Sequence, residues 1–347
     1  MRHIRFNLVL AATAAAALLT ACGGSSGSNN AARSFEALKP GESSVYCDGA
    51  CKQALRINTK ARNVSCKVGV SWSSTSFPYG AAAIARSKQT AKNFPHMTLF
   101  TADGRGDATT QSSQIDDLVA RGIKVLIISP FDAKALAPAV KRAEAKGVKV
   151  IASDRSVDAP VTTYVGADNV EDGQTAGRYV IKLLHGKGNV IELQGSLGAS
   201  PTIARHKGFA EALAGAPGVK VIASETANYD RATGLKVMDD MLQRFPSGKI
   251  NAVFAHNDEM AIGAIQAIRE AGRQDQIKVV GIDGQESALR LVKAGQYAGT
   301  VVYPLPVPEH ILAAAKACAG ESLPKRIKQA TPLVTESDVA KYDGTTF

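Results

Sequence analysis

The feature that most constrains the fold is a regular alternation of short apolar runs and longer amphipathic stretches, which begins at Lys67. The runs 125–128 and 150–152 contain only apolar residues, and each is followed by a segment with the periodicity of a helix. Continuous apolar runs are typical of strands covered on both faces. Strands that alternate with helices predict parallel sheets with right-handed crossovers, and therefore an α/β fold.

The alternation starts a second time after residue 160 and continues to about residue 320 without a long linker. At 347 residues the chain is long enough for two units of ordinary domain size. We therefore expect two similar α/β lobes that face each other across a cleft. Residues 23–65 precede the alternation and lack sustained periodicity.

The first residues are typical of an export signal. Arg2 and Arg5 precede the apolar run 8–19, which is too short to span a bilayer and is followed by small residues. This pattern predicts a signal peptide over residues 1–21 and an exported protein.

The signal ends in the sequence LTAC at residues 19–22, which resembles a bacterial lipobox. A lipobox implies cleavage before Cys22 and a lipid on that cysteine; the alternative is a signal peptide that merely contains a cysteine. The Gly- and Ser-rich residues 23–30 are suited to a flexible tether. We expect residues 22–65 to form a lipid-anchored tether with a cysteine-containing extension.

Four further cysteines follow Cys22. Because an oxidising compartment permits disulfides, we expect one bridge among Cys47, Cys51 and Cys66, in a pairing that the sequence leaves open. Cys318 lies in an alanine-rich stretch and is interpreted as a small core residue. No histidine lies at zinc-ligand spacing beside Cys47 and Cys51, so neither a metal nor another cofactor is expected.

The formal net charge of +10 raises the question of a nucleic-acid partner. The basic residues are scattered along the expected helices, as in 140–147, instead of forming one concentrated tract. We interpret them as solvated helix faces and expect no nucleic acid as partner.

Polar and aromatic side chains follow the expected strands of both units, at the ends where open parallel sheets bind ligands. Asp154 and Arg155 follow one strand, Asn257 another, and Asp283 a third. The candidate binding residues are Trp72, Phe77, Tyr79, Asp154, Arg155, Arg205, Tyr229, Asn257, Asp283 and Tyr303.

The chemistry of this set favours a neutral, hydroxyl-rich small molecule. Carboxylates accept hydrogen bonds from hydroxyls, guanidinium groups donate in a fork, and the Asn amide does both. Aromatic rings cover the C–H faces of a sugar. Asp154 and Asp283 would repel an anion.

Several candidates also have a purely structural interpretation. Asn257 is a good N-cap for the helix expected after it, in which Asp258 and Glu259 meet the positive end of the helix dipole. Asp283 could form a turn with its own backbone, and Arg155 could pair with a neighbouring acid. At least one of the aromatic residues in 72–79 is expected to pack in the core.

Several of these segments resemble type I periplasmic sugar-binding proteins, over roughly residues 66–340. The segments that carry the resemblance are ASDRS (152–156), IARHKGFAEAL (203–213), NYDRATG (228–234), HNDEMAIGAIQAI (256–268), VVGIDG (279–284) and the region 103–120. The resemblance implies two Rossmann-like lobes with parallel sheets, joined by a three-segment hinge. On this pattern the N-terminal lobe comprises 66–160 plus 304–329, and the C-terminal lobe 161–303 plus 330–347.

The resemblance also implies roles for individual residues. In ribose-binding proteins the matching positions bind sugar, and they fall here on Asp154, Arg155, Arg205, Tyr229, Asn257 and Asp283. The stretch 190–213 is similar to galactofuranose-binding proteins. Tyr303 stands where ribose binders have Gln, and Gly80 where galactofuranose binders carry Arg, so the identity of the sugar stays open.

The function expected from the resemblance is that of a substrate-binding lipoprotein of a sugar ABC transporter. It would be a monomer, periplasmic or on the cell surface and held to the membrane by its lipid. It would capture a pentose or hexose, with a furanose form included, by closure of its lobes and deliver it to the permease. The alternative is a receptor that presents a sugar or signal molecule to a membrane sensor kinase or chemoreceptor.

Two other classes are disfavoured. A transcription regulator would need an N-terminal helix-turn-helix, and this chain begins with a signal sequence instead. A glycosidase would need two carboxylates across a bond, for which Asp154 and Asp283 are the candidates. We expect Arg155 and Arg205 to keep these acids ionised, which is unsuitable for a general acid, so an enzyme is not expected.

Overall fold

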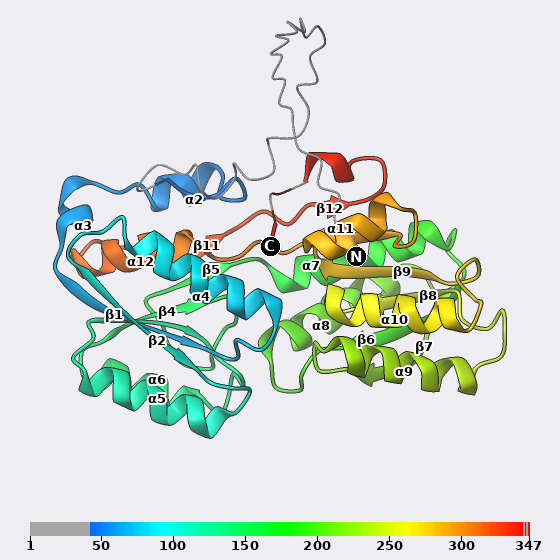
Figure 1. The fold of residues 1–347 in the computed structure, drawn as a ribbon, viewed down its shortest axis with the longest axis horizontal. Helices are drawn as coiled ribbons and strands as arrows, with labels where there is room; N and C mark the ends of the chain where they lie inside the picture. The colour runs from blue at the N-terminus through cyan, green and yellow to red at the C-terminus, as the bar shows by residue number, and fades with distance from the viewer. Residues whose placement is uncertain (1–41, 343, 345) are drawn as a thin grey trace, which may run out of the picture.

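The computed structural model describes residues 42–342, 344, 346 and 347, and Figure 1 shows its two α/β lobes side by side. The expected signal peptide 1–21, the lipidation site Cys22 and the tether up to residue 41 lie outside the described residues. Within the described part of the chain, no helix has the length and apolar character to cross a membrane.

The first lobe contains a six-stranded sheet in the order β11-β5-β4-β3-β1-β2, and every neighbouring pair is parallel. Helices α4 and α12 pack on one face, and α5 and α6 pack against each other on the other face. Its elements are β1 (Cys66–Trp72), α4 (Pro78–Ala91), β2 (Met97–Asp103), α5 (Ala108–Ala120), β3 (Val125–Ser129), α6 (Ala137–Ala145), β4 (Lys149–Ser153), β5 (Thr163–Gly166), α12 (Glu309–Cys318) and β11 (Arg326–Lys328).

The second lobe repeats this plan with the strand order β12-β10-β9-β8-β6-β7, in which only the short edge strand β12 is antiparallel. Helices α7 and α8 pack together on one face, and α9 and α10 on the other. Its elements are α7 (Asn169–Leu183), β6 (Gly188–Gln194), α8 (Ser200–Ala214), β7 (Val219–Thr226), α9 (Arg231–Arg244), β8 (Ala252–Ala255), α10 (Asp258–Glu270), β9 (Lys278–Asp283), α11 (Glu286–Lys293), β10 (Gly299–Val302), β12 (Leu333–Val334) and the 3₁₀ turn η1 (Val339–Lys341).

The chain passes between the two sheets three times: after β5, after β10, and between β11 and β12. The first crossing differs from the expected division, which placed residues 161–166 in the C-terminal lobe. β5 pairs with β4 and β11, so 163–166 belong to the sheet of the first lobe. Nothing in the short run TYVG (163–166) itself selects one sheet over the other. Its pairing with β4 places it in the first sheet.

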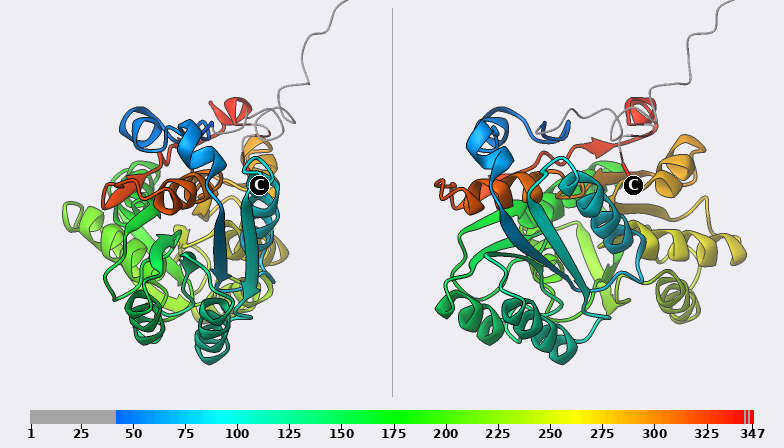
Figure 2. Two further views of the ribbon diagram at one scale, coloured as in Figure 1. Left: turned by 90° about the vertical axis from the view of Figure 1, so that its left-hand side faces the viewer. Right: turned by 60° about the vertical axis from the view of Figure 1, so that its left-hand side comes forward.

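The extension that precedes β1 packs across the hinge. It forms α2 (Gly49–Ala54) and α3 (Thr59–Asn63), which lie beside β11 and α12 in both views of Figure 2. Tyr46 is buried with residues of the second lobe, whereas Cys47 and Leu55 are buried with residues of the first. The backbone carbonyl of Tyr46 accepts a hydrogen bond from Ala330 N, in the third crossing, at 2.8 Å.

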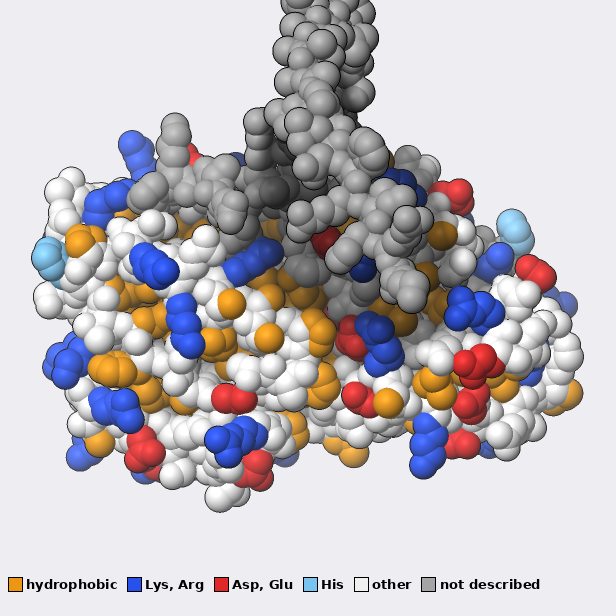
Figure 3. Space-filling model, in the orientation of Figure 1, with side chains coloured by type: hydrophobic (Ala, Val, Ile, Leu, Met, Phe, Trp, Pro, Cys, Tyr) orange, Lys and Arg blue, Asp and Glu red, His pale blue; other side chains and the backbone are white. Residues whose placement is uncertain are grey.

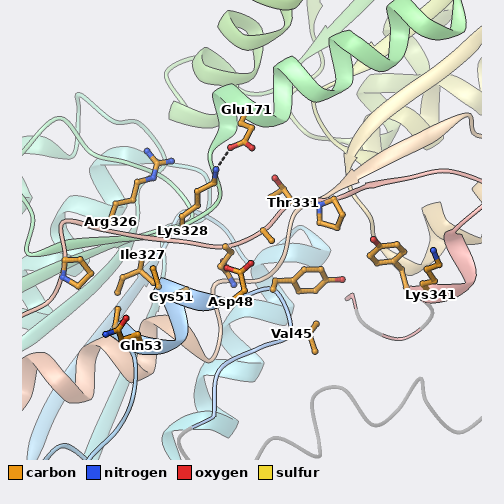
Figure 4. A pocket seen from close by; sticks show the side chains of 18 residues that line it. Val45, Asp48, Cys51, Gln53, Glu171, Arg326, Ile327, Lys328, Thr331 and Lys341 are labelled. Carbon is orange, nitrogen blue, oxygen red and sulfur yellow. Dashed lines mark hydrogen bonds and ion pairs between the residues drawn. The ribbon is translucent and has the colours of Figure 1, made fainter.

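Figure 4 shows the groove between this extension and the hinge, with Cys51 and Asp48 on one side and Thr331 on the hinge segment. Across the same groove the Lys328 ammonium pairs with the Glu171 carboxylate. Lys328 ends β11 of the first lobe and Glu171 lies in the first turn of α7. This ion pair therefore joins the two lobes at the hinge.

Two disulfides are present among the described residues, Cys47–Cys51 and Cys66–Cys318. The interpretation of Cys318 as a plain core residue was wrong, because its sulfur is bonded to that of Cys66. The two cysteines are 252 residues apart and meet because α12 packs beside β1. Only tertiary packing brings them together.

Candidate functional site

All ten candidate residues line one cavity between the lobes, with a volume of about 60 Å³. The first lobe contributes Trp72 at the end of β1, Phe77 and Tyr79 at the start of α4, and Asp154 and Arg155 after β4. The second lobe contributes Arg205 on α8, Tyr229 and Asn257 beyond β7 and β8, and Asp283 at the end of β9. Tyr303 follows β10 at the second hinge crossing. The residues meet because the carboxyl ends of parallel strands lie at one edge of each sheet.

Asp154 lies on the first-lobe side of the cavity and is held there by hydrogen bonds. Its Oδ2 accepts a hydrogen bond from Ser129 Oγ at 2.7 Å, and its backbone carbonyl accepts one from Tyr303 OH at 3.0 Å. Asp154 has a φ of 67°, in the left-handed region that residues other than glycine rarely adopt. Arg155 donates to the carbonyl of Phe131 at 3.3 Å and its Nε lies 3.8 Å from Asp154 Oδ2.

Arg205 is the central cation of the second-lobe side and is only 3% exposed. Its Nε donates to Asn169 Oδ1 at 2.9 Å, and its Nη1 donates to the backbone carbonyl of His256. The guanidinium lies 4.6 Å from the ring centroid of Tyr303, a cation–π distance. These contacts fix the plane of the guanidinium.

Asn257 caps a helix and also lines the cavity. Its Oδ1 accepts a hydrogen bond from Met260 N at 3.0 Å, so it is the N-cap of α10. Its Nδ2 donates to the carbonyl of Tyr229 at 3.3 Å, and the side chain lines the cavity. Capping uses one lone pair of the amide oxygen, and the bond to Tyr229 uses one of the two amide hydrogens. One lone pair and one amide hydrogen of Asn257 remain for other partners.

The two acids of the cavity have raised pKa values. Burial raises the pKa of Asp154, although Arg155 and the hydrogen bond from Ser129 act against it. Burial likewise raises the pKa of Asp283 well above its usual range; Arg205 opposes this shift, and the charges of Asp258 and Asp154 add to it. For both acids desolvation therefore outweighs the attraction of the arginines, and each pKa lies above its ordinary value instead of below it.

The aromatic residues form a connected wall. The ring centroids of Trp72 and Tyr79 are 6.4 Å apart, and those of Tyr79 and Tyr303 are 5.7 Å apart. Trp72 is 1% exposed and belongs to the core cluster of the first lobe as well as to the cavity lining. Packing and cavity lining are thus not exclusive for this residue.

Four lining residues were not among the candidates: Ser73, Ser74, Gly80 and Pro201. Gly80 is required by close packing, because a Cβ there would lie 2.0 Å from the carbonyl oxygen of Ser74. Behind the lining, Ser129, Asn169 and His256 hold the side chains or backbone of lining residues. Ser129 and Asn169 lie just beyond or at the end of strands β3 and β5, which is the signal that could have found them.

Two hydrogen bonds join the lobes close to the cavity lining. Ala133 N of the first lobe donates to Gly198 O of the second at 3.2 Å, and Ser156 N donates to Ser200 Oγ at 2.9 Å. Separation of the two lobes requires both of these hydrogen bonds to break.

None of the groups of His, Cys, Asp and Glu in residues 42–342 is arranged to hold a metal ion. On the face shown in Figure 3, basic and acidic side chains are interspersed over both lobes. The largest groove, at the hinge, carries cationic and anionic side chains together.

The chain belongs to the periplasmic binding protein family, since the model of a periplasmic binding protein domain matches residues 68–311. The ribose import binding protein RbsB of Bacillus subtilis (strain 168) is 37% identical over 235 residues, which is 67% of this chain and 75% of that protein. The resemblance to type I periplasmic sugar-binding proteins and the expected two-lobe fold are thereby confirmed.

Solved structures show the same fold. An ABC transporter solute-binding protein from Mycobacterium smegmatis with bound glycerol superimposes with a TM-score of 0.76 at 35% identity, covering 81% of this chain and 97% of that one. The fructose-binding periplasmic domain of a hybrid two-component system has a TM-score of 0.76 at 32% identity, covering 80% of this chain and 93% of that domain.

Proposed function

We propose that this protein is the substrate-binding lipoprotein of a sugar ABC transporter. It captures a neutral monosaccharide or related polyol, a pentose or hexose with furanose forms included, as a monomer. The observation that carries the proposal is one cavity between the lobes, to which both lobes contribute hydrogen-bonding side chains and to which Trp72, Tyr79 and Tyr303 add a connected aromatic wall. Similarity to an import binding protein and to a transporter's solute-binding protein supports the same function.

The mechanism is closure of the lobes around the ligand. Asp154 and Arg155 present hydrogen-bonding groups from one side, and Arg205, Asn257 and Asp283 from the other. A ligand that contacts both lobes binds the closed form more strongly than the open form, so it shifts the equilibrium towards closure. The closed outline is then the shape that a permease distinguishes from the open one.

The binding residues have no role in bond cleavage in this proposal. Asp154 and Asp283 serve as hydrogen-bonding partners of hydroxyl groups, and the cavity holds and releases its ligand unchanged. Turnover of a nitrophenyl glycoside by the purified protein would contradict this.

Isothermal titration against D-ribose, D-galactose, D-fructose, xylitol and myo-inositol tests the function. We expect saturable binding of at least one of these compounds with one site per chain. Absence of binding to every sugar and polyol tested would overturn the proposal.

A second candidate function is a receptor that presents its ligand to a membrane sensor kinase or chemoreceptor. It is supported by the similarity to a fructose-binding domain that belongs to a two-component system. The cavity would serve either function equally, so the genes beside this one discriminate: a permease and an ATPase indicate import, and a histidine kinase indicates sensing.

Asn257→Ala and Arg155→Ala are each expected to weaken binding of the best ligand of the panel by about 1–3 kcal/mol, the cost of a lost hydrogen bond to a buried polar partner. Asn257→Ala also removes the cap of α10, so Asn257→Ser, which retains a capping oxygen, is the matched control for stability. Calorimetry and thermal unfolding of the three variants give both quantities. Unchanged affinity in both alanine variants would refute the site assignment while leaving the fold intact.

We further propose that the protein is exported and anchored by lipid on Cys22, because LTAC at residues 19–22 resembles a lipobox. Metabolic labelling with palmitate is expected to mark the wild-type protein and to leave Cys22→Ser unlabelled. Equal labelling of both would show that the lipid is attached elsewhere.

A further inference from the structure

A buried imidazole–carboxylate pair lies behind the second-lobe wall of the cavity. His256 Nε2 and Glu192 Oε1 are 3.0 Å apart, and the two residues are 0% and 1% exposed. Neither residue lines the cavity. A carboxylate in the middle of β6 is costly to bury, so its presence calls for a physical reason.

The hydrogen bonds define the protonation of the pair. His256 Nδ1 accepts from Gly195 N at 3.5 Å, which leaves Nε2–H to donate to Glu192. Burial lowers the pKa of His256, so the ring stays neutral at pH 7. Burial alone would raise the pKa of Glu192, but its hydrogen bonds, first of all from His256, outweigh burial and bring the pKa to about 2. The bond is therefore charge-assisted.

His256 is connected to three residues of the cavity wall. Its backbone carbonyl accepts the hydrogen bond from Arg205 Nη1, and Asn257 is the next residue in the chain. Gly195, held by the ring, lies directly under Tyr229, since a Cβ on Gly195 would be 2.0 Å from Tyr229 Cζ. His256 is thus connected to three different segments, through its ring to Gly195 and through its backbone to Arg205 and Asn257.

We propose that Glu192 and His256 are positioning residues for the binding cavity. Glu192 fixes the plane and tautomer of the His256 ring, and His256 in turn sets the positions of Arg205, Asn257 and the support of Tyr229. Neither residue touches the ligand. The expected effect on ligand affinity rests on the proposed function. The expected effect on the order of the cavity wall in the ligand-free protein does not.

Glu192 has further partners, which supply a matched control. Ser224 Oγ donates to its Oε2 at 2.6 Å, and His206 Nδ1 lies 3.0 Å from the same carboxylate. The side chain of His206 is 52% exposed, in contrast to the fully buried His256. His206 contacts the carboxylate from α8 without contacting His256, so His206→Ala removes one partner of Glu192 and leaves the proposed connection intact.

The first measurement is binding of the tightest compound among D-ribose, D-galactose, D-fructose, xylitol and myo-inositol. His256→Phe keeps a ring against Phe254 but removes both ring hydrogen bonds, and we expect at least a tenfold loss of affinity. Glu192→Leu is expected to lose a similar factor, and Glu192→Gln, whose amide oxygen still accepts from Nε2–H, to recover most of it. His206→Ala is expected to bind within twofold of the wild type.

The second measurement is hydrogen–deuterium exchange of the ligand-free protein. His256→Phe is expected to speed exchange at least tenfold in segments 193–197 and 255–260 and to leave 150–156 in the first lobe unchanged. If the wild-type protein binds nothing in the panel, the proposed function fails, and this exchange result still decides the positioning role.

The inference is overturned if His256→Phe exchanges at the wild-type rate in both segments, 193–197 and 255–260. It is also overturned if that variant binds its ligand within twofold of the wild-type affinity. Equal losses in Glu192→Gln and Glu192→Leu would also overturn it, because a positioning role requires rescue by a retained acceptor. Thermal unfolding midpoints identify any variant that is merely unstable.

Discussion

Replacing Cys66 and Cys318 together with alanine is expected to lower the free energy of unfolding by about 5–6 kcal/mol. The disulfide joins residues 252 positions apart, so in the chain-entropy model its loss greatly increases the freedom of the unfolded chain. Urea denaturation of the oxidised wild type and of the double variant measures the difference.

The Cys47–Cys51 disulfide is the internal control, because it closes a loop of only four positions. The same model predicts a loss of about 2 kcal/mol for Cys47→Ala with Cys51→Ala. Loss of the Cys66–Cys318 bond should therefore lower the free energy of unfolding more than loss of the Cys47–Cys51 bond. Equal losses in the two double variants would contradict an origin in the unfolded chain.

Arg205→Ala is expected to weaken binding of the best ligand of the sugar and polyol panel by about 2–5 kcal/mol, the cost in affinity of truncating a buried hydrogen-bonded charged group. Arg205 counters the burial of Asp283, and its loss also leaves Asn169 Oδ1 and the carbonyl of His256 without their donor. Isothermal titration gives the affinity, and thermal unfolding gives the accompanying loss of stability. The affinity of Arg205→Lys should lie between those of the wild type and Arg205→Ala, because lysine keeps the charge but not the fork of donors.

Arg231→Ala is a suitable control for this experiment. Arg231 makes two hydrogen bonds to Glu259, but its side chain is 45% exposed and does not line the cavity. An exposed ion pair contributes about 0–1 kcal/mol to stability, and its loss should leave ligand affinity unchanged. Comparable losses of affinity in Arg205→Ala and Arg231→Ala would refute the central role of Arg205.

The candidate site was accessible to sequence reasoning because of the geometry of parallel sheets. A residue that follows an apolar run, such as Asp154 or Asn257, lies at the carboxyl end of a strand whatever the packing around it. All such ends within one sheet meet at one edge, and the edges of the two sheets face each other here. For that reason ten residues from eight segments could be expected in one cavity, and the structure places all ten there.

The residues that were missed act through contacts rather than through position in a strand. His256 precedes Asn257 and Glu192 lies inside β6, so local pattern marks both as parts of a buried strand region. Their hydrogen bond joins residues 64 positions apart. Likewise, the raised pKa values of Asp154 and Asp283 follow from their burial, which depends on the closed lobes and cannot be read from neighbouring letters.

The sequence by itself determined the two α/β lobes, the family and the set of polar strand ends, because these follow from local periodicity and from motifs within single segments. The tertiary structure alone decided that β5 joins the first sheet, that Cys66 bonds to Cys318, and that His256 stands behind the cavity wall. Each of these depends on which distant segments pack together. Such packing depends on the free energy of the whole chain. The periodicity of a single segment therefore does not predict it.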